Sequence, residues 1–511
     1  MTAAPPTPTN ERAPNPELLA AVDLGSNSFH LAVARVVDGA LTVVDRLRER
    51  VQLGAGLGPD KLLAEAAQSR ALATLARFGQ RLQHTPTAAV RAVGTDTLRV
   101  AKNAREFTER AAEALGHPIE IISGDEEARL IYRGVVHDLP HEDGKRQLVM
   151  DIGGGSTEVI LGVGLNHEHL TSLHLGCVSY TKKFFPDGKL TRDRFKKAII
   201  AARLQFERLR GPYFRATWDR ALGSSGTINA VQAILRDNGW TDGPVELRGL
   251  KRLRTALIDI GHADRLDLPG LKPTRAPVLA AGLAILYGAF KTLPLTSLQA
   301  SGGALREGVM YDLLGRYAQQ DVRETTIRNL TERFRVDEDQ AVRVERTATT
   351  LFGFVAAQWF RDDARLHARQ CLRWAARLHE IGLAVAFHGY HKHGAYVVGN
   401  STMPGFSEDE QRVLAALVAS HRRRISRSDL EAVPPNEVEL VRRLAALLRL
   451  AVHLNRNRSW RALPEVALAA DDQRLVLSFP DGFLDDNPLT RADFDEEVDR
   501  LAGAGITLVV T

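Results

Sequence analysis

The sequence predicts a duplicated α/β domain with a ligand cleft between its two lobes, followed by a mainly helical region. Three observations predict this class. A strand, an Asp-containing turn, a strand, a turn and a third strand open the chain from residue 18, and the same plan recurs from residue 148. Both Asp-containing turns consist of small residues. After about residue 321, glycine turns become rare and amphipathic helices dominate.

We therefore divide the chain into four parts. Residues 1–16 are rich in Pro, Thr, Ala and Asn, and we expect a disordered lead-in there that lacks the pattern of a signal peptide. Lobe I is predicted over residues 17–135 and lobe II over residues 136–322. The helical region covers residues 323–511 and ends in a small subdomain with strands.

Composition is that of an ordinary globular protein and excludes few functions. The 511 residues are 44% hydrophobic and 25% charged, and the net charge of +5 permits an anionic ligand without requiring one. The two cysteines, Cys177 and Cys371, form neither a disulfide framework nor a zinc-binding spacing, which fits a reducing cytoplasm. We expect a cytoplasmic protein without a membrane helix, and peripheral attachment to the inner membrane through basic patches stays open.

The elements of lobe I follow from the spacing of apolar residues and turn residues. A tight hairpin is predicted at residues 38–39, which read Asp-Gly. A helix from Asp125 carries acids in its first turn, where the helix dipole favours them. Strands are predicted over residues 18–23, 29–37, 41–47, 87–93 and 119–122, and helices over residues 60–83 and 102–115.

Lobe II and the helical region are read in the same way. In lobe II, strands are predicted over residues 148–152, 159–162 and 169–178, and helices over residues 192–210 and from Ile228. Residues 220–222 lead into a small-residue turn at residues 223–227, and residues 298–304 repeat this arrangement with a turn at residues 301–303. In the helical region, helices are predicted over residues 340–360, 366–381, 408–420 and 437–455, and strands over residues 474–479 and 506–510.

The turn at residues 151–158 is the most informative stretch. Its three consecutive glycines let the backbone adopt positive φ and approach a ligand closely. Successive N–H groups in such a turn can bind an anion. An acid stands on each side, Asp151 and Glu158. Because a carboxylate repels phosphate unless a cation lies between them, the stretch indicates phosphate together with Mg²⁺.

The earlier turn, residues 23–28, is the counterpart in lobe I. It holds an acid, one glycine and three small polar side chains, which can surround a phosphate from the side opposite the glycine turn. Asp23 and Asp151 both stand at strand ends, so a metal between the lobes would be within reach of either. Two ordinary turns without a ligand remain the alternative.

A hydrolase also needs a base that activates water. Residues 125–127 are three consecutive acids at a junction between a strand and a helix. Such acids are favoured by the helix dipole, but one that turns into the cleft could deprotonate water. Spacing alone does not choose between Glu126 and Glu127. Arg99 and Arg129 could supply positive charge for phosphate oxygens, while no Walker A motif or dinucleotide-binding glycine fingerprint is present.

Five motifs together resemble one known family. They are residues 23–29, 94–99, 123–130, 151–158 and 302–308, in this order, and the likeness continues at residues 372–382 and 391–396. The combination is similar to the exopolyphosphatase / guanosine pentaphosphate phosphohydrolase (Ppx/GppA) family, and the length is that of its long bacterial exopolyphosphatase members. The resemblance covers nearly the whole chain after the lead-in.

The resemblance implies an actin-like, sugar-kinase-like fold with two ribonuclease-H-like lobes. It implies that Glu127 is the catalytic base, with Asp151 and Glu158 in the catalytic site, and that Mg²⁺ lies near Asp23, Asp151 and Glu158. A role for K⁺ stays open. The implied phosphate contacts come from the two turns and one arginine: Gly25, Ser26, Asn27, Ser28, Arg99, Gly153, Gly154, Gly155, Ser156 and Thr157.

The helical region resembles the HD phosphohydrolase fold. Where that fold has a His-Asp metal pair, this chain has His379 and Glu380, which puts a second metal site in doubt. The remaining basic side chains suggest a path for polyphosphate, with exposed loop histidines and a solvated helix end as the alternative. The residues of this path would be His388, His391, Lys392, His393, Arg422 and Arg423.

These inferences predict an exopolyphosphatase that removes terminal phosphates from linear polyphosphate. Guanosine pentaphosphate phosphohydrolase is the alternative by the same chemistry, with guanosine tetraphosphate as its product. A kinase, a non-catalytic alarmone or polyphosphate sensor and an actin-like assembly protein are further alternatives. The resemblance implies a homodimer, and we expect no nucleic acid as a partner.

Overall fold

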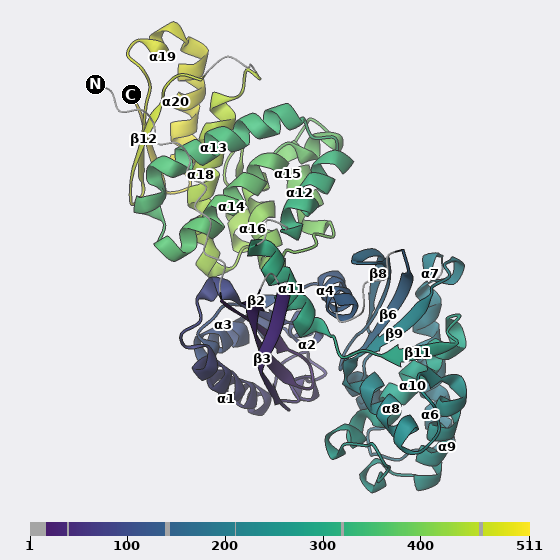
Figure 1. The fold of residues 1–511 in the computed structure, drawn as a ribbon. Helices are drawn as coiled ribbons and strands as arrows, with labels where there is room; N and C mark the ends of the chain where they lie inside the picture. The colour runs from purple at the N-terminus through teal and green to yellow at the C-terminus, as the bar shows by residue number, and fades with distance from the viewer. Residues whose placement is uncertain (1–16, 38–39, 138–143, 210, 318–320, 459–462) are drawn as a thin grey trace. The chain divides into compact units, whose positions relative to one another are not determined.

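The computed structural model describes residues 17–37, 40–137, 144–209, 211–317, 321–458 and 463–511. The lead-in and the hairpin turn predicted at residues 38–39 lie outside these residues. The chain divides into two compact units, Met1–Asp321 and Val322–Thr511. Unit 1 contains two lobes, each built on one large β-sheet, and unit 2 is mainly helical (Figure 1). This confirms the predicted α/β fold with a helical C-terminal region.

Lobe I is a five-stranded sheet with the strand order β3-β2-β1-β4-β5. β1, β2 and β3 form an antiparallel meander, and β4 lies parallel to β1. The central strand β1 is apolar because both of its faces are covered. The helices α1 (Glu65–Leu82) and α3 (Ala104–Leu115) contribute to the core on one face. The strands are β1 (Leu18–Leu24), β2 (Phe29–Val37), β3 (Ala40–Glu49), β4 (Val90–Gly94) and β5 (Ile119–Ile121).

Lobe II repeats this plan in a six-stranded sheet with the order β10-β11-β9-β6-β7-β8. β6, β7 and β8 form the antiparallel meander, and β9 lies parallel to β6 as β4 does to β1. The helix α10 (Ala276–Thr292) is almost entirely apolar because it is buried in the core of this lobe. The strands are β6 (Arg146–Ile152), β7 (Thr157–Val163), β8 (Asn166–Leu173), β9 (Arg220–Ser224), β10 (Val245–Glu246) and β11 (Ser297–Ala300).

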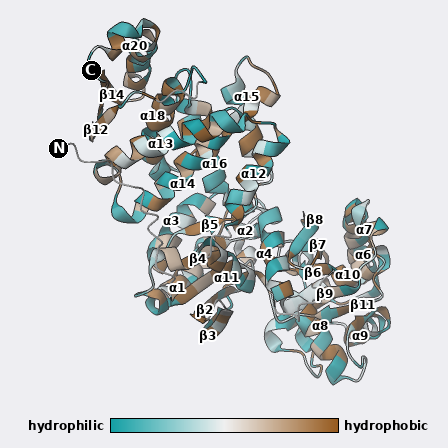
Figure 2. Ribbon diagram, turned by 45° about the horizontal axis from the view of Figure 1, so that its top comes forward, coloured by the Kyte–Doolittle hydropathy of each residue, from teal (hydrophilic) through white to brown (hydrophobic). Residues whose placement is uncertain are grey.

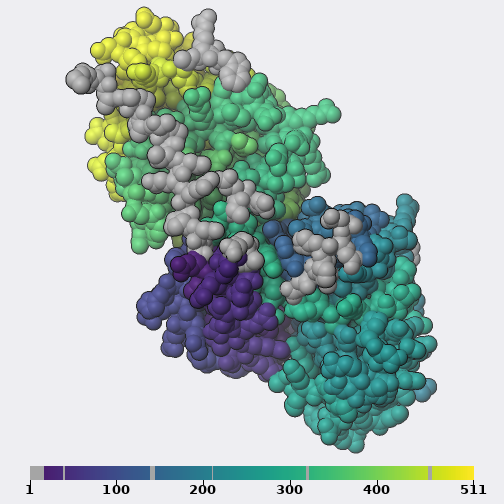
Figure 3. Space-filling view, viewed as in Figure 1, coloured from purple at the N-terminus to yellow at the C-terminus, as the bar shows by residue number. Residues whose placement is uncertain are grey.

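Two helices, α4 (Gly124–His137) and α11 (Leu305–Tyr317), join the lobes through one shared core. That core contains Val93 of the first sheet and Val149 of the second. The helices touch backbone to backbone, since a Cβ at Gly134 would lie 2.6 Å from the amide nitrogen of Gly308. Although α11 follows lobe II in sequence, it also packs on β1 and β2. Figure 3 shows the lobes as separate masses, purple to blue for lobe I and mostly teal for lobe II.

Unit 2 is a helical bundle with a small three-stranded sheet of order β12-β13-β14. Teal and brown residues alternate along its helices in Figure 2, as expected for amphipathic helices around one core. No helix in the described part of the chain is long and apolar enough to cross a membrane. The principal elements are α13 (Glu338–Trp359), α14 (Asp362–Leu378), α16 (Glu408–Ser420), α18 (Val438–Leu454), β12 (Ala467–Asp471), β13 (Arg474–Ser478) and β14 (Thr507–Val510).

Two predicted elements end differently in the structure. The helix predicted from residue 60 begins at Glu65, because the carboxylate of Asp60 accepts a hydrogen bond from the amide of Leu62 and forms a turn there. The strand predicted over residues 169–178 is β8, which ends at Leu173. Leu173 pairs with Thr157, the first residue of β7, so no partner in β7 is left for the residues that follow. Cys177 instead begins the helix α5 (Cys177–Phe184).

Candidate active site

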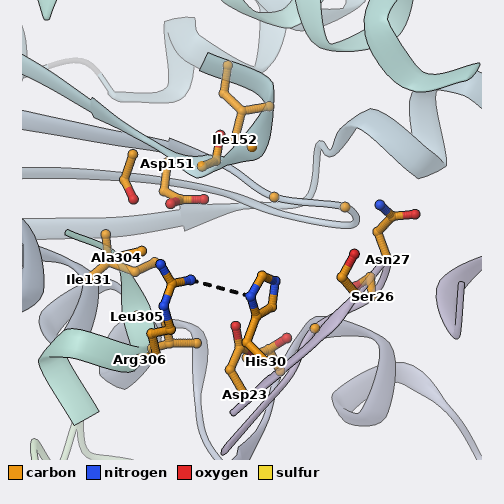
Figure 4. A pocket seen from close by; sticks show the side chains of 18 of the residues that line it. Asp23, Ser26, Asn27, His30, Ile131, Asp151, Ile152, Ala304, Leu305 and Arg306 are labelled. Carbon is orange, nitrogen blue, oxygen red and sulfur yellow. Dashed lines mark hydrogen bonds between the residues drawn. The ribbon is translucent and has the colours of Figure 1, made fainter. Parts of the chain in front are cut away.

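A cavity of about 340 Å³ lies in unit 1 where the two Asp-containing turns meet. Its walls are the β1–β2 turn, the β6–β7 turn, the first residues of α8 (Ser225–Asp237) and the loop before α11. Asp23 of lobe I and Asp151 of lobe II both line it, from opposite sides (Figure 4). The fold therefore brings together two turns that are far apart in the sequence.

The β1–β2 turn is held in place by its neighbours. Thr97 Oγ1 donates a hydrogen bond to Ser26 Oγ at 2.7 Å, and the amide of Gly54 donates to the carbonyl of Ser26 at 2.8 Å. Ser26 and Ser28 are buried, and Asn27 lines the cavity with them. This turn therefore presents polar groups from a fixed backbone.

The β6–β7 turn needs its glycines for space. Glycine permits positive φ, but none of Gly153, Gly154 and Gly155 uses that freedom here. A Cβ at Gly154 would lie 2.7 Å from the Cβ of Ser26, and one at Gly155 would overlap the carboxylate of Asp96. The glycines therefore let the turn of lobe II approach lobe I closely.

Four carboxylates line this cavity: Asp23, Asp96, Glu127 and Asp151. Burial and the nearby Glu127 raise the pKa of Asp23 to about 7. Burial raises the pKa of Asp151 to about 6, against the effect of a hydrogen bond from Ser224. The buried Asp23 Oδ1 has no hydrogen-bond partner among the described residues. Buried acids that repel one another in this way are stabilised by a cation.

The carboxylates of this cavity fit a Mg²⁺ ion that would also bind phosphate oxygens of a substrate. Among the described residues, no group of three or more His, Cys, Asp and Glu side chains is arranged to hold a metal by itself. Mg²⁺ usually keeps several waters and uses one or two carboxylates together with substrate phosphates. Asp23 and Asp151 both line the cavity and could supply these carboxylates. Glu158 is not among the lining residues, and its Oε1 accepts a hydrogen bond from Ser172 at 2.8 Å.

Two adjacent glutamates in the first turn of α4 have different surroundings. Glu127 lines the cavity, and Arg99 Nη1 donates a hydrogen bond to its Oε2 at 2.7 Å. Glu126 instead accepts two hydrogen bonds from the buried Arg129, at 2.7 and 2.8 Å. Glu127 alone of this pair therefore lines the cavity, whereas Glu126 is held in an ion pair with Arg129.

Two of the predicted phosphate contacts have other roles in this structure. Arg99 is not among the described lining residues, and besides Glu127 it binds the carbonyl of Ile122 at 2.9 Å. Burial raises the pKa of Glu127, and Arg99 opposes that shift and so favours the ionised form that a base requires. Thr157 is also absent from the lining, and its Oγ1 donates to the carbonyl of Leu175 at 2.6 Å.

Sequence reasoning missed most of the basic side chains of the cavity. Arg306 Nη1 donates a hydrogen bond to His30 Nδ1 at 3.4 Å, which Figure 4 shows as a dashed line. Two signals were present: Arg46 lies in the strand predicted over residues 41–47 and Arg48 one residue beyond it, and Arg306 lies inside the motif at residues 302–308. Arg275, which also lines the cavity, carries no local signal.

The predicted polyphosphate path lies in unit 2 and is only partly basic. His391, Lys392 and His393 belong to the helix α15 (Tyr390–Asn400) and not to a loop. Burial and Arg422 lower the pKa of His391 to about 4, so this buried side chain carries no charge that would attract a polyanion. Arg422 stacks on the ring of Tyr390 at 4.5 Å. The exposed members are His388, Lys392 and Arg423.

The fold and the site define the class of protein. Two lobes with matching strand–turn–strand motifs enclose carboxylates and small-residue turns, which is the arrangement of an actin-like, two-lobed phosphatase. The chain belongs to the Ppx/GppA phosphatase family. The model of that family matches residues 32–317, and the model of Ppx/GppA phosphatase domain III matches residues 322–498.

Individual relatives agree with this assignment. Proteins of Aeromonas hydrophila and Aeromonas salmonicida, both named guanosine-5'-triphosphate,3'-diphosphate pyrophosphatase, are 40% and 39% identical over 486 residues. Each match covers 95% of this chain and 97% of the relative. The crystal structure of an exopolyphosphatase from Cytophaga hutchinsonii is 25% identical, covers 58% of this chain and 98% of its own, and has a TM-score of 0.53.

Proposed function

We propose that this protein removes the terminal phosphate of guanosine pentaphosphate as orthophosphate. The observation that carries the proposal is that Glu127 shares one cavity with both small-residue turns and with Asp23 and Asp151. The two Aeromonas proteins, whose name states this substrate, match nearly the full length of the chain. The sequence put polyphosphate first, and these relatives favour the alternative.

The cavity supplies the groups that phosphoryl transfer requires. Amides of the glycine turn and hydroxyls of Ser26, Ser28 and Ser156 surround the terminal phosphate. Glu127 accepts a proton from a water molecule, whose oxygen attacks the terminal phosphorus. The bond from that phosphorus to the bridging oxygen breaks, and the bridging oxygen leaves with the shortened substrate. Positioning and charge stabilisation dominate such reactions.

Mg²⁺ bound at Asp23 and Asp151 would neutralise charge on the phosphate oxygens. In this proposal Arg99 acts on Glu127 and not on the substrate. Burial raises the pKa of Glu127, and the guanidinium of Arg99 opposes that rise and fixes the direction of the carboxylate. In this proposal Glu158 is a positioning residue, which accepts a hydrogen bond from Ser172 and does not contact the substrate.

Linear polyphosphate is the second candidate substrate, and one observation favours it. The described residues that line the cavity include arginines but no Phe, Tyr or Trp that would stack on a guanine base. A substrate made only of phosphates would need no such platform.

Orthophosphate release separates the two candidates. We expect a higher kcat/KM for guanosine pentaphosphate than for long-chain polyphosphate, and loss of both activities when Mg²⁺ is chelated. The reverse order of kcat/KM would make polyphosphate the substrate. Release from neither compound in the presence of Mg²⁺ would refute the proposal.

Gly154→Ala tests the close approach of the two turns. The added methyl would press on the Cβ of Ser26, and overpacking of this kind costs about 1–3 kcal/mol. We expect kcat/KM to fall about tenfold or more, because the cavity walls are forced apart. Gly243→Ala is the matched control in the same lobe, since a Cβ there meets nothing within 4 Å. Equal kcat/KM for the two variants would show that the turns tolerate separation.

A further inference from the structure

A lysine of lobe II forms hydrogen bonds with the backbone of lobe I. Lys182 lies on α5, and its Nζ donates hydrogen bonds to the carbonyls of Gly54 and Leu57, both at 3.0 Å. These carbonyls belong to the 3₁₀ helix η1 (Gly54–Gly56) and to the residue that follows it, and α5 packs on η1. Lys182 is not among the described residues that line the cavity, so its ammonium group binds the opposite lobe and not the contents of the cavity.

The first turn of α5 is bonded to the glycine turn of lobe II. The amide of Cys177 donates a hydrogen bond to the carbonyl of Gly153 at 2.9 Å, and the amide of Val178 donates to the carbonyl of Gly154 at 2.8 Å. Since a helix rises 1.5 Å per residue, Lys182 lies only about 7.5 Å along the axis from Cys177. Any displacement of this short helix therefore moves the glycine turn and Lys182 together.

In lobe I, the segment that accepts these bonds is itself bonded to the β1–β2 turn. The amide of Gly54 donates to the carbonyl of Ser26 at 2.8 Å, and the amide of Gln52 donates to the carbonyl of Asn27 at 2.9 Å. Lys182 therefore completes a chain of hydrogen bonds that runs from the glycine turn through α5 and η1 to the β1–β2 turn. This chain holds two turns of different lobes at one spacing.

Two adjacent lysines of α5 differ in what they contact. Among the described residues, Lys182 forms no ion pair with a carboxylate, and its hydrogen-bond partners are the two carbonyls. Partial burial lowers the pKa of its ammonium group, and the carbonyls offset part of the hydration that is lost. The Nζ of Lys183 instead lies 5.3 Å from the ring centroid of Phe184, in the same helix. Lys182 is therefore the member of this pair that connects the lobes.

We propose that Lys182 is a positioning residue that sets the spacing of the two cavity turns around the terminal phosphate. The inference rests on the proposed function, in which both turns bind one phosphate. The lobes also join through the core shared by α4 and α11, and Lys182 adds a connection close to the turns themselves. Without it, the turns spend more time at a wider separation, and the fraction of protein that can hold the phosphate from both sides falls.

Lys182→Met tests the inference, because methionine keeps an unbranched stem and removes the ammonium group. For guanosine pentaphosphate we expect KM to rise about tenfold, since the apparent affinity falls with the fraction of competent protein. We expect kcat to change by less than about threefold, because bound substrate draws the turns together. Lys182→Arg keeps a long side chain with several donors and should recover most of the loss. An unchanged KM in Lys182→Met would overturn the inference.

Lys183→Met is the matched control. It removes the same charge from the next position of α5, and we expect KM to stay within about twofold of the wild-type value, because the described contact of Lys183 lies within lobe II. A lysine that merely attracts an anionic substrate would behave differently. Both variants would then raise KM alike, and the increase would shrink as salt is added. That pair of results would overturn the inference.

The distance between the lobes keeps this result separate from the proposed function. Spin labels at Glu113→Cys in α3 and Lys196→Cys in α6 (Arg192–Phe206), two exposed positions, report that distance by electron paramagnetic resonance. The two native cysteines are buried and react slowly with the label. We expect a longer and broader distance distribution in Lys182→Met than in the wild type or in Lys183→Met.

The two measurements fail independently. An unchanged distance distribution in Lys182→Met overturns the inference even if KM rises. A longer distance in Lys182→Met, in a protein whose wild type releases phosphate from neither candidate substrate, would refute the proposed reaction. The part of the inference that gives Lys182 control of the spacing would then still be supported by the distance.

Discussion

Glu127→Gln is expected to lower kcat for orthophosphate release by about 100- to 10,000-fold, the usual loss when a positioned base is removed. Glutamine keeps the size of the side chain and can still accept a hydrogen bond from Arg99. It cannot take a proton from water. Substrate binding is therefore retained, and a kinetic assay of phosphate release together with calorimetric binding checks both parts of the prediction.

Asp125→Asn is the control for this variant. Asp125 lies in the same first turn of α4 and does not line the cavity, so its substitution should leave kcat within about threefold of the wild type. Phosphate release by Glu127→Gln at a near-normal rate would show that another group activates the water. Asp96, which lines the same cavity, would then be the next candidate.

Asp312→Asn is expected to destabilise unit 1 by about 3–5 kcal/mol, as when one partner of a buried ion pair is removed. Asp312 of α11 is buried, and it accepts hydrogen bonds from Arg91 of β4 at 2.8 Å and from Arg129 of α4 at 2.5 Å. The variant leaves both guanidinium groups buried without this charge. Faster hydrogen exchange of the amides of α4 and α11, and a lower denaturant midpoint for unit 1, are the measurements.

The control is Asp264→Asn, because that side chain is 87% exposed and its change should cost less than about 0.5 kcal/mol. The pH dependence of stability gives an independent check. Burial alone would raise the pKa of Asp312, but Arg129 and Arg91 outweigh it and hold the pKa well below its usual range. The stabilisation is therefore complete above about pH 4 and is lost as the pH falls further. The Asn variant should lack this acid-dependent part.

The repeated pattern of strands and turns was readable in the sequence because it is local. Residues 23–28 and 151–158 carry their own signals of small residues between apolar runs, so the duplication and the cavity-lining turns could be predicted. The ends of elements were less predictable. Residues 60–64 fit a helical period, yet the side chain of Asp60 forms a turn that delays α1 to Glu65.

The basic part of the cavity shows where prediction from sequence stopped. Arg275 comes from a segment far from both turns, and nothing near it in the sequence indicates a ligand. Arg99 carried a motif, but its hydrogen bond to Glu127 joins the helix α2 (Asp96–Val100) to α4, and these helices are not consecutive in the sequence. Likewise, the glycines of the β6–β7 turn were identified from the sequence, but their close approach to Ser26 of the other lobe is visible only in the fold.

The sequence by itself determined the two turns, the acids at their ends and the membership of the family. Each of these depends on short motifs of consecutive residues, which can be recognised without the fold. Only the tertiary structure decided that Glu127 faces the cavity while Glu126 joins the buried ion network, and that Lys182 of lobe II binds carbonyls of lobe I. The physical reason is that local patterns fix the path of the chain over a few residues. Which side chains meet a common ligand depends on helix rotation, strand register and the packing of the two lobes.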